Sequence, residues 1–369
     1  MTHPDQDKIQ VIVFGPGFGE CILIHIGDHG WIIIDSCLND DKEPAGLSYL
    51  SSIGVDVENN IKLIVATHWH DDHIKGLFKT LEVAKSANFA MSSAMSHQEF
   101  LAFLIAHDRQ PNMRIGRGGT EIIKCLRLMK SRGKVPKFVV QDRLIESWDI
   151  GKISHGKRVE LLALSPSDAQ LADTLADASK FLRDNSTENS AKNLPKKRIS
   201  SENKNNLSIA ALLVVGDIGI LFGADVEERN IENYGWKNIV TNRKDRAPSP
   251  FIFKVAHHGS QGAHLDQVWD DFLEAKPISI VTPWKLGGNF LPKAEDIQRI
   301  KERSSFAYIT SSEIIPLKRR YDREVLKDIQ RSGVSLTSIQ YKCGSVSITV
   351  NPDSGVVEET VLTNTAKLI

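Results

Sequence analysis

Short apolar runs separated by glycine-rich turns occupy the first part of the chain. Ile9–Phe14, Cys21–Ile26 and Trp31–Asp35 are three such runs, and they predict a meander of three strands. A fourth run, Ile61–Ala66, is followed by helical spacing over Ile74–Ala84. The amino-terminal part is therefore expected to form a sheet with a helix packed after its fourth strand.

The rest of the chain mixes strands and helices without a repeat of fixed period. Ser92–Arg132 is mainly helical in pattern, and the polar segment at about 183–206 is expected to be a mobile surface loop or linker. Further strands are expected at Val159–Leu164, Ser208–Val215, Ile218–Phe222, Phe251–Ala256, Pro277–Val281, Ala307–Thr310, Thr337–Tyr341 and Val346–Val350, and further helices at Pro292–Arg303 and Arg323–Ser332.

Composition indicates a globular protein rather than a membrane or disulfide-rich one. The chain has 369 residues, of which 41% are hydrophobic, so it can bury a large core. No run approaches the roughly 18 apolar residues of a membrane helix, and the N-terminus lacks an apolar signal core, so we expect no membrane association and a cytoplasmic location. Four scattered cysteines without a CxxC pair are expected to be small core residues.

Basic residues are concentrated in one segment although the whole chain is neutral. Lysine plus arginine and aspartate plus glutamate each number 46. Between Arg109 and Lys137, however, Glu121 is the single acid among many bases. Lys124, Arg127 and Lys130 recur there at helical spacing, opposite an apolar face. This face is either a rail for a polyanionic substrate such as nucleic acid or an ordinary solvated surface.

The strongest chemical signal is His68-Trp69-His70-Asp71-Asp72-His73, directly after the strand Ile61–Ala66. Residues two apart on extended chain project to the same side, so His68 and His70 can converge on one ion, while Asp72 and His73 turn toward a second. Imidazole and carboxylate ligands suit zinc, manganese or iron. The alternative is a polar loop that happens to be rich in histidine.

A second histidine pair also stands at a strand end. Phe251–Ala256 runs into His257-His258-Gly259-Ser260. The glycines of Gly15–Glu20 are spaced almost like those of a nucleotide-binding loop, but they lie between two strands and no helix follows, which excludes a Rossmann site.

Together these segments resemble the metallo-β-lactamase superfamily and, within it, the metallo-hydrolase domain of ComEC-type DNA-uptake proteins. The resemblance rests on the His-x-His-x-Asp-His motif, the strand-end Asp35, Asp225 after Ile220-Leu221-Phe222-Gly223-Ala224, and Lys254-Val255-Ala256-His257-His258-Gly259-Ser260. It extends from Ile9 to about Pro292. It implies an α+β fold, a four-layer αββα sandwich, as a single domain over 1–369 with a helical basic insertion at about 92–137.

The resemblance also implies a site with two divalent metal ions, zinc or manganese. His68 and His70 are expected to hold one ion and Asp72, His73 and His257 the other, with Asp225 between them. His257 is preferred to His258 because it comes first after the strand, which leaves His258, with Asp72, as a candidate catalytic residue. The residues expected behind the ligands are Asp35, Asn206, Ser208 and Ser260, and His264 is a candidate substrate contact together with the basic helix face.

Two departures from the family pattern affect the expected site. Most members supply a third histidine to the first metal, but only Asn206 and Ser208 stand at the expected position. Leu291 replaces a histidine that the subgroup tends to carry before the proline at position 292. We therefore expect weaker occupancy of the first metal site and the loss of one phosphate contact.

Hydrolysis is the reaction expected of such a centre, because two metals can hold a bridging hydroxide and stabilise the charge that develops during attack. The leading hypothesis is a phosphodiesterase, most simply a nuclease acting on a nucleic-acid substrate. The alternatives are a hydrolase of small esters, thioesters or lactones, and a degenerate, non-catalytic binding protein. The sequence says nothing about protein partners.

Overall fold

The computed structural model describes residues 3–108, 118–149, 158–185, 205–243, 248–286, 288–312, 314–317, 323–333 and 338–369. Within these ranges the chain forms two eight-stranded sheets and two short hairpins. The predicted α+β class with two large sheets is confirmed, and it is consistent with a metallo-β-lactamase fold.

The first sheet is built around the amino-terminal meander. Its spatial order is β19-β18-β1-β2-β3-β4-β5-β6. The strands are β1 (Ile9–Gly15), β2 (Cys21–His25), β3 (Trp31–Ile34), β4 (Ile61–Ala66), β5 (Asn88–Ser92), β6 (Lys137–Val139), β18 (Gly344–Val350) and β19 (Val357–Thr363). β1, β2 and β3 are antiparallel as expected, whereas β3 to β6 run parallel. β1 also pairs with β18, from Ile9 opposite Val350 to Gly15 opposite Gly344.

The second sheet has the spatial order β20-β15-β12-β11-β10-β9-β8-β7. Its strands are β7 (Arg143–Asp149), β8 (Arg158–Ala163), β9 (Ala211–Val215), β10 (Ile218–Phe222), β11 (Pro250–Lys254), β12 (Ile278–Val281), β15 (Phe306–Ile309) and β20 (Lys367–Leu368). β10, β11, β12 and β15 are parallel to one another. The hairpins are β13 (Trp284–Leu286) with β14 (Asn289–Leu291) and β16 (Ile314–Leu317) with β17 (Ser338–Tyr341).

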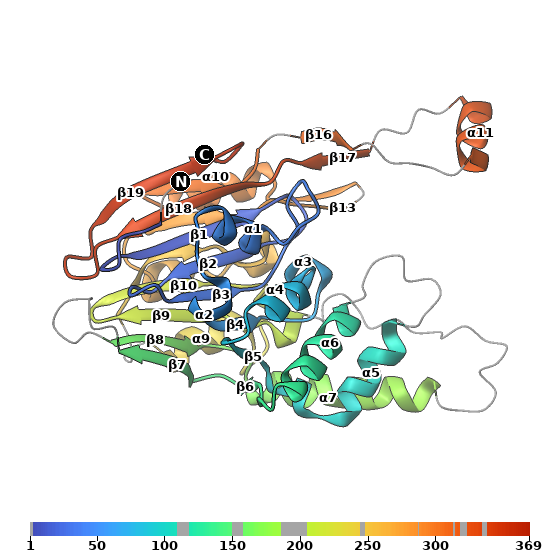
Figure 1. Cartoon of the computed structure of the whole chain (residues 1–369), viewed down its shortest axis with the longest axis horizontal. Helices are drawn as coiled ribbons and strands as arrows, with labels where there is room; N and C mark the ends of the chain where they lie inside the picture. Colours follow the sequence, from blue (N-terminus) through green and yellow to red (C-terminus); the bar gives the residue numbers. More distant parts are fainter. Residues whose placement is uncertain are drawn as a thin grey trace.

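The helices lie on the outer faces of the sheets, except for the last one, which stands apart from both sheets beyond the hairpin of β16 and β17 (Figure 1). They are α1 (Ala45–Ser52), α2 (Val57–Asn60), α3 (Asp71–Ile74), α4 (Leu77–Val83), α5 (Gln98–Asp108), α6 (Gly118–Ser131), α7 (Asp168–Asn185), α9 (Gly235–Arg243), α10 (Ala294–Glu302) and α11 (Arg323–Ser332). Of the expected polar loop, 186–204 lies outside the described residues. So do Arg109, Arg114 and Arg117 of the basic segment.

Three apolar clusters separate the layers. Alternate residues of β1, such as Val11 and Val13, meet residues of the second sheet between the two sheets, while Ile12 and Phe14 face the helices outside the first sheet. This division follows from the two-residue period of a strand buried on both faces. A third cluster, around Trp236 and Phe253, lies outside the second sheet. The order helix, sheet, sheet, helix therefore has apolar cores between all of its layers.

No helix in the described part of the chain combines the length and the apolar character that crossing a bilayer requires. The four cysteines are buried and unpaired, as the sequence predicts.

Candidate metal centre

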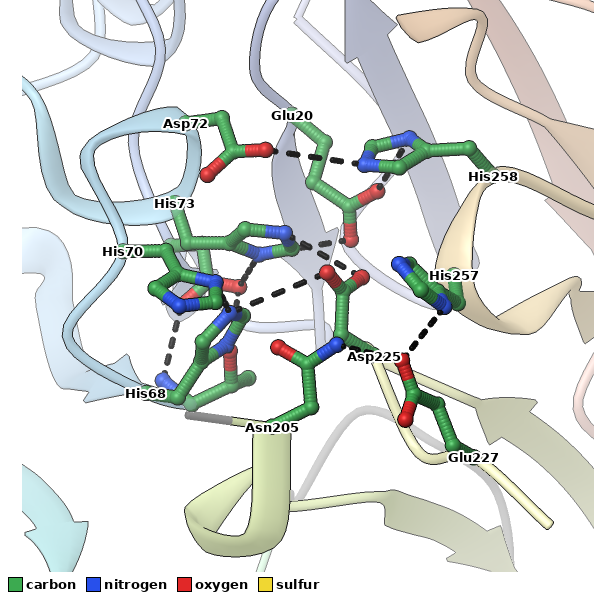
Figure 2. Close-up of polar contacts among 12 residues, drawn as sticks. Glu20, His68, His70, Asp72, His73, Asn205, Asp225, Glu227, His257 and His258 are labelled. Carbon is green, nitrogen blue, oxygen red and sulfur yellow. Dashed lines mark hydrogen bonds and ion pairs between the residues drawn. The ribbon is translucent and has the colours of Figure 1, made fainter. Parts of the chain in front are cut away.

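The predicted histidine motif lies where the parallel strand β4 ends. His68 is 1% exposed, and its Nε2 atom is 3.0 Å from His70 Nδ1, so the two side chains lie side by side, as the spacing predicts, with their rings edge to face (Figure 2). Burial lowers the pKa of His68, and the neighbouring His73 and His70 lower it further. His68 is thus held neutral, which is the form that binds a metal.

Asp35 orients the third histidine of the motif. It follows β3, and its Oδ2 atom is 2.7 Å from His73 Nδ1 and accepts a 2.6 Å hydrogen bond from Thr67 Oγ1. Because a carboxylate only accepts, Asp35 holds a proton on Nδ1 of His73 and turns Nε2 toward the centre. Without bound metal, burial alone would lower the pKa of His73, but the carboxylates of Asp225, Glu20 and Asp35 hold it well above its usual value. The predicted role of Asp35 behind a ligand histidine therefore has the required geometry.

Asp225 occupies the space between the two parts of the motif. It follows β10 and is 2% exposed, with Oδ1 3.2 Å from His73 Nε2 and Oδ2 3.8 Å from His68 Nε2. Burial alone would raise the pKa of Asp225, but the neighbouring His73 and His257 hold it well below its usual value. Asp225 is therefore an anion placed between both expected metal sites, although its bridging role stays a prediction.

The two histidines after β11 lie in different surroundings. Both have positive φ angles, 44° at His257 and 55° at His258. His258 is 1% exposed, with Nε2 3.8 Å from Asp72 Oδ2 and Nδ1 3.1 Å from the Thr282 carbonyl oxygen. His257 lies at the rim, where its Nδ1 atom is 3.1 Å from Glu227 Oε1. The geometry thus favours His258 as the ligand and His257 as the group that faces a substrate.

Glu20 belongs to this centre, although the sequence reasoning did not identify it. It is 1% exposed, its Oε2 atom accepts hydrogen bonds from Lys254 Nζ and Thr282 Oγ1, and its backbone NH donates to the carbonyl oxygen of Asp72 at 2.9 Å. Burial alone would raise the pKa of Glu20, but the Lys254 ammonium and the nearby His73 lower it. The sequence feature that could have indicated Glu20 as a site residue is its position directly after a glycine-rich turn and before β2.

Asn205 is a second residue that the sequence reasoning missed. It is 7% exposed, on a 3-10 turn (Asn205–Leu207) before β9, and its amide donates to Glu227 Oε1 at 2.8 Å. Figure 2 draws Asn205 among the site residues. The expected neighbours Asn206 and Ser208 are also buried, and Ser208 NH donates to the carbonyl oxygen of Asn205.

The other predicted site residues lie farther out. Ser260 Oγ is 3.2 Å from His257 Nδ1, so Ser260 contacts the rim histidine rather than a ligand. His264 Nε2 is 3.1 Å from Asp266 Oδ1. Lys124, Arg127 and Lys130 are exposed on one face of α6, opposite the buried Ile122, Cys125 and Met129.

Bound metal ions would account for the arrangement of the donor atoms better than hydrogen bonds among the side chains do. Among the described residues, His73 Nε2, His258 Nε2, Asp225 Oδ1 and Glu20 Oε1 are buried without a hydrogen bond of normal geometry. Glu20, Asp35, Asp72 and Asp225 are four buried or nearly buried carboxylates, and of these Glu20 forms an ion pair with the buried ammonium of Lys254. Such an excess of buried negative charge is costly unless cations compensate it. His68, His70, Asp72, His73, Asp225 and His258 are the side chains that would hold them.

Replacing Asp35 tests the support behind His73. Asp35→Asn keeps the size of the side chain but removes the charge that holds the His73 ring, so metal affinity should fall by roughly 10- to 100-fold. Competition with a chromophoric chelator measures the change. The exposed neighbour Asp41→Asn is the matched control, and equal affinities of the two variants would contradict the role of Asp35.

Comparison with known proteins identifies the segment that contains the histidine motif. Residues 14–95 match the family model described as Metallo-beta-lactamase superfamily. Similar solved structures include a metallo-β-lactamase with a HARLDQ motif from Cronobacter sakazakii, with 14% identity over 65% of this chain and 76% of that chain and a TM-score of 0.33. Another is BJP-1, a subclass B3 metallo-β-lactamase of Bradyrhizobium japonicum, with 14% identity over 65% of this chain and 70% of that chain and a TM-score of 0.31. No curated protein matches the chain.

Proposed function

We propose that this metallo-β-lactamase superfamily domain is a metal-dependent phosphodiesterase that cleaves nucleic acid. The superfamily consists mostly of metal-dependent hydrolases and usually binds divalent metals, so the general class follows from the match at residues 14–95. The proposal adds the substrate class and two bound ions, zinc or manganese. The sequence resemblance to the metallo-hydrolase domain of ComEC-type DNA-uptake proteins supports the same substrate.

One observation carries the substrate class: the exposed basic face of α6 belongs to a helix that starts against the histidine motif. A β-carbon at Gly118, the first residue of α6, would lie 1.9 Å from the carbonyl oxygen of Trp69, so helix and motif are in direct backbone contact. Lys124, Arg127 and Lys130 then follow along the helix. A phosphate chain lying along this face would lead into the centre, and small neutral substrates would gain nothing from it.

Each residue around the centre has a distinct task. Bound divalent ions would polarise a phosphoryl oxygen and supply a nucleophile at neutral pH. Asp35 keeps His73 in one tautomer, and Glu227 holds the Nδ1 side of His257 so that the rest of the ring is available to a substrate. Trp284 stacks near His258, with ring centroids 6.3 Å apart, and half-buried Phe18 lies 6.5 Å from Trp284. This aromatic pair offers a surface on which a base can stack.

The test is hydrolysis of bis-p-nitrophenyl phosphate and of labelled single- and double-stranded DNA and RNA, with zinc or manganese added. The wild type should cleave at least one nucleic acid, and Asp72→Ala/His73→Ala should not. Metal binding without phosphodiester cleavage would refute the proposed substrate class and favour a hydrolase of esters, thioesters or lactones. Failure to bind metal would support a non-catalytic binding protein.

The basic face of α6 makes a separate prediction. Neutralising Lys124, Arg127 and Lys130 together should weaken nucleic-acid binding and reduce the slope of log K against log salt by about 2 to 3, because each lost phosphate contact removes roughly 0.7 to 0.9. Fluorescence anisotropy over a salt series measures it. The exposed lysines Lys42, Lys79 and Lys85 provide a control triple of equal charge, and an unchanged slope in the α6 variant would favour a small-molecule substrate.

A further inference from the structure

The first metal site lacks one histidine of the usual set, and the structure places a different side chain beside it. We propose that Asn205 Oδ1 is the third protein ligand of the ion held by His68 and His70. This inference rests on the metal centre of the proposed function, but it does not depend on the substrate.

The burial of Asn205 is the first argument. The residue is 7% exposed, and its Oδ1 atom is buried without a hydrogen-bond partner among the described residues. An amide oxygen removed from water without a partner costs about 1 to 3 kcal/mol. Such a group is retained where it has a ligand to bind, and a carbonyl oxygen is a usual donor to divalent metals.

The orientation of the amide is the second argument. Asn205 Nδ2 is 2.8 Å from Glu227 Oε1, and Glu227 Oε2 accepts from Arg229 at 3.1 Å. Because a carboxylate cannot donate, the group bonded to Glu227 must be the NH₂ and not the oxygen. The oxygen is therefore turned away from Glu227, and Figure 2 shows it pointing toward His68 and His70.

The neighbouring candidates fit this role less well. Asn206 is buried on the same 3-10 turn. The two-residue alternation of side chains in a strand does not apply within such a turn, so it gives no reason to place Asn206 in the site. Ser208 is also buried with an unpartnered Oγ, so it is the residue against which Asn205 has to be tested. Among the described residues, no contact fixes the direction of the Ser208 hydroxyl in the way that Glu227 fixes the amide of Asn205.

A consequence for metal choice follows from the ligand type. Two imidazoles with an amide oxygen form a harder and weaker site than three imidazoles. Manganese should therefore lose less affinity than zinc relative to a three-histidine site. The second ion, held by Asp72, His73 and His258, should not share this weakness.

The test measures metal binding by the full chain in the absence of substrate. Apo protein is titrated with zinc and with manganese against a chelator of known affinity, and the bound manganese is followed by electron paramagnetic resonance. Asn205→Ala should weaken the weaker site by roughly 10- to 100-fold, and Asn205→His should tighten zinc binding there by at least about tenfold. Asn206→Ala and Ser208→Ala should each weaken metal binding far less than Asn205→Ala does.

Each alternative result has a defined meaning. Unchanged affinity in both Asn205 variants would overturn the proposal, and so would a loss confined to Ser208→Ala. Circular dichroism checks the fold, and Asn205→His, which restores a donor, remains informative if Asn205→Ala is unstable. A protein that binds metal as described but cleaves no phosphodiester would refute the proposed function and leave the role of Asn205 intact.

Discussion

Replacing His258 by alanine is expected to remove one metal ion and to lower metal-dependent hydrolysis by roughly a thousandfold. His258 is buried, and its Nε2 atom faces Asp72 across 3.8 Å. Losing a ligand of this site removes several kcal/mol of stabilisation of the developing charge, and about 4 kcal/mol corresponds to roughly a thousandfold in rate. Metal content by mass spectrometry and initial rates on bis-p-nitrophenyl phosphate measure the two effects.

His257→Ala is the matched control, because the two histidines are adjacent and differ in where they point. The Nδ1 atom of His257 is bonded to Glu227 at the rim, so this variant should keep its full metal content and lose rate only. The reverse result, in which His257→Ala loses metal and His258→Ala does not, would restore the assignment made from the order of the residues along the strand.

Lys254→Met is expected to destabilise the fold by about 3 to 5 kcal/mol. Lys254 and Glu20 are each 1% exposed and form an ion pair inside the protein. Removing the ammonium leaves a buried carboxylate without its principal cation, and its desolvation is then uncompensated. Urea denaturation of the metal-free protein, followed by tryptophan fluorescence, gives the change in unfolding free energy.

The pH dependence of this variant separates charge from packing. In the wild type the pKa of Glu20 is lowered, so its contribution to stability is present above the unfolded pKa and is lost as pH falls. Without Lys254 burial should raise that pKa, and the deficit should then shrink as pH falls toward about 4.3, where a free glutamate protonates. Glu20→Gln/Lys254→Met should recover most of the loss at neutral pH. A deficit independent of pH and unchanged in the double variant would indicate lost packing.

The strands could be placed from the sequence because their apolar runs are bounded by turns. Ile61–Ala66 and Ile218–Phe222 agree with β4 and β10, and Phe251–Ala256 overlaps β11. His68, His70 and His73 could be grouped from the sequence for the same reason, because they come directly after the end of a recognisable strand. Asp35 and Asp225 also stand at the ends of parallel strands, where ligand sites form in sheets of this type.

The parts of the site that were missed depend on backbone conformations without such regularity. The left-handed conformations of His257 and His258 end the alternation of β11, so the order of the two residues does not determine which one faces inward. Asn205 lies on a short 3-10 turn that no apolar pattern marks. Glu20 accepts a hydrogen bond from Lys254, which is remote in sequence. No residue spacing within either segment could predict that contact.

The pairing of β1 with β18 has a consequence for how the protein is made. β1 is buried along its whole length, and one of its edges is covered only by residues 344–350. During translation that edge stays open while the intervening chain is still being synthesised, and an open apolar strand edge attracts other chains. The nascent protein should therefore depend on chaperones late into its synthesis, and ribosome-bound chains that stop before residue 344 should aggregate more readily than chains that extend past residue 350.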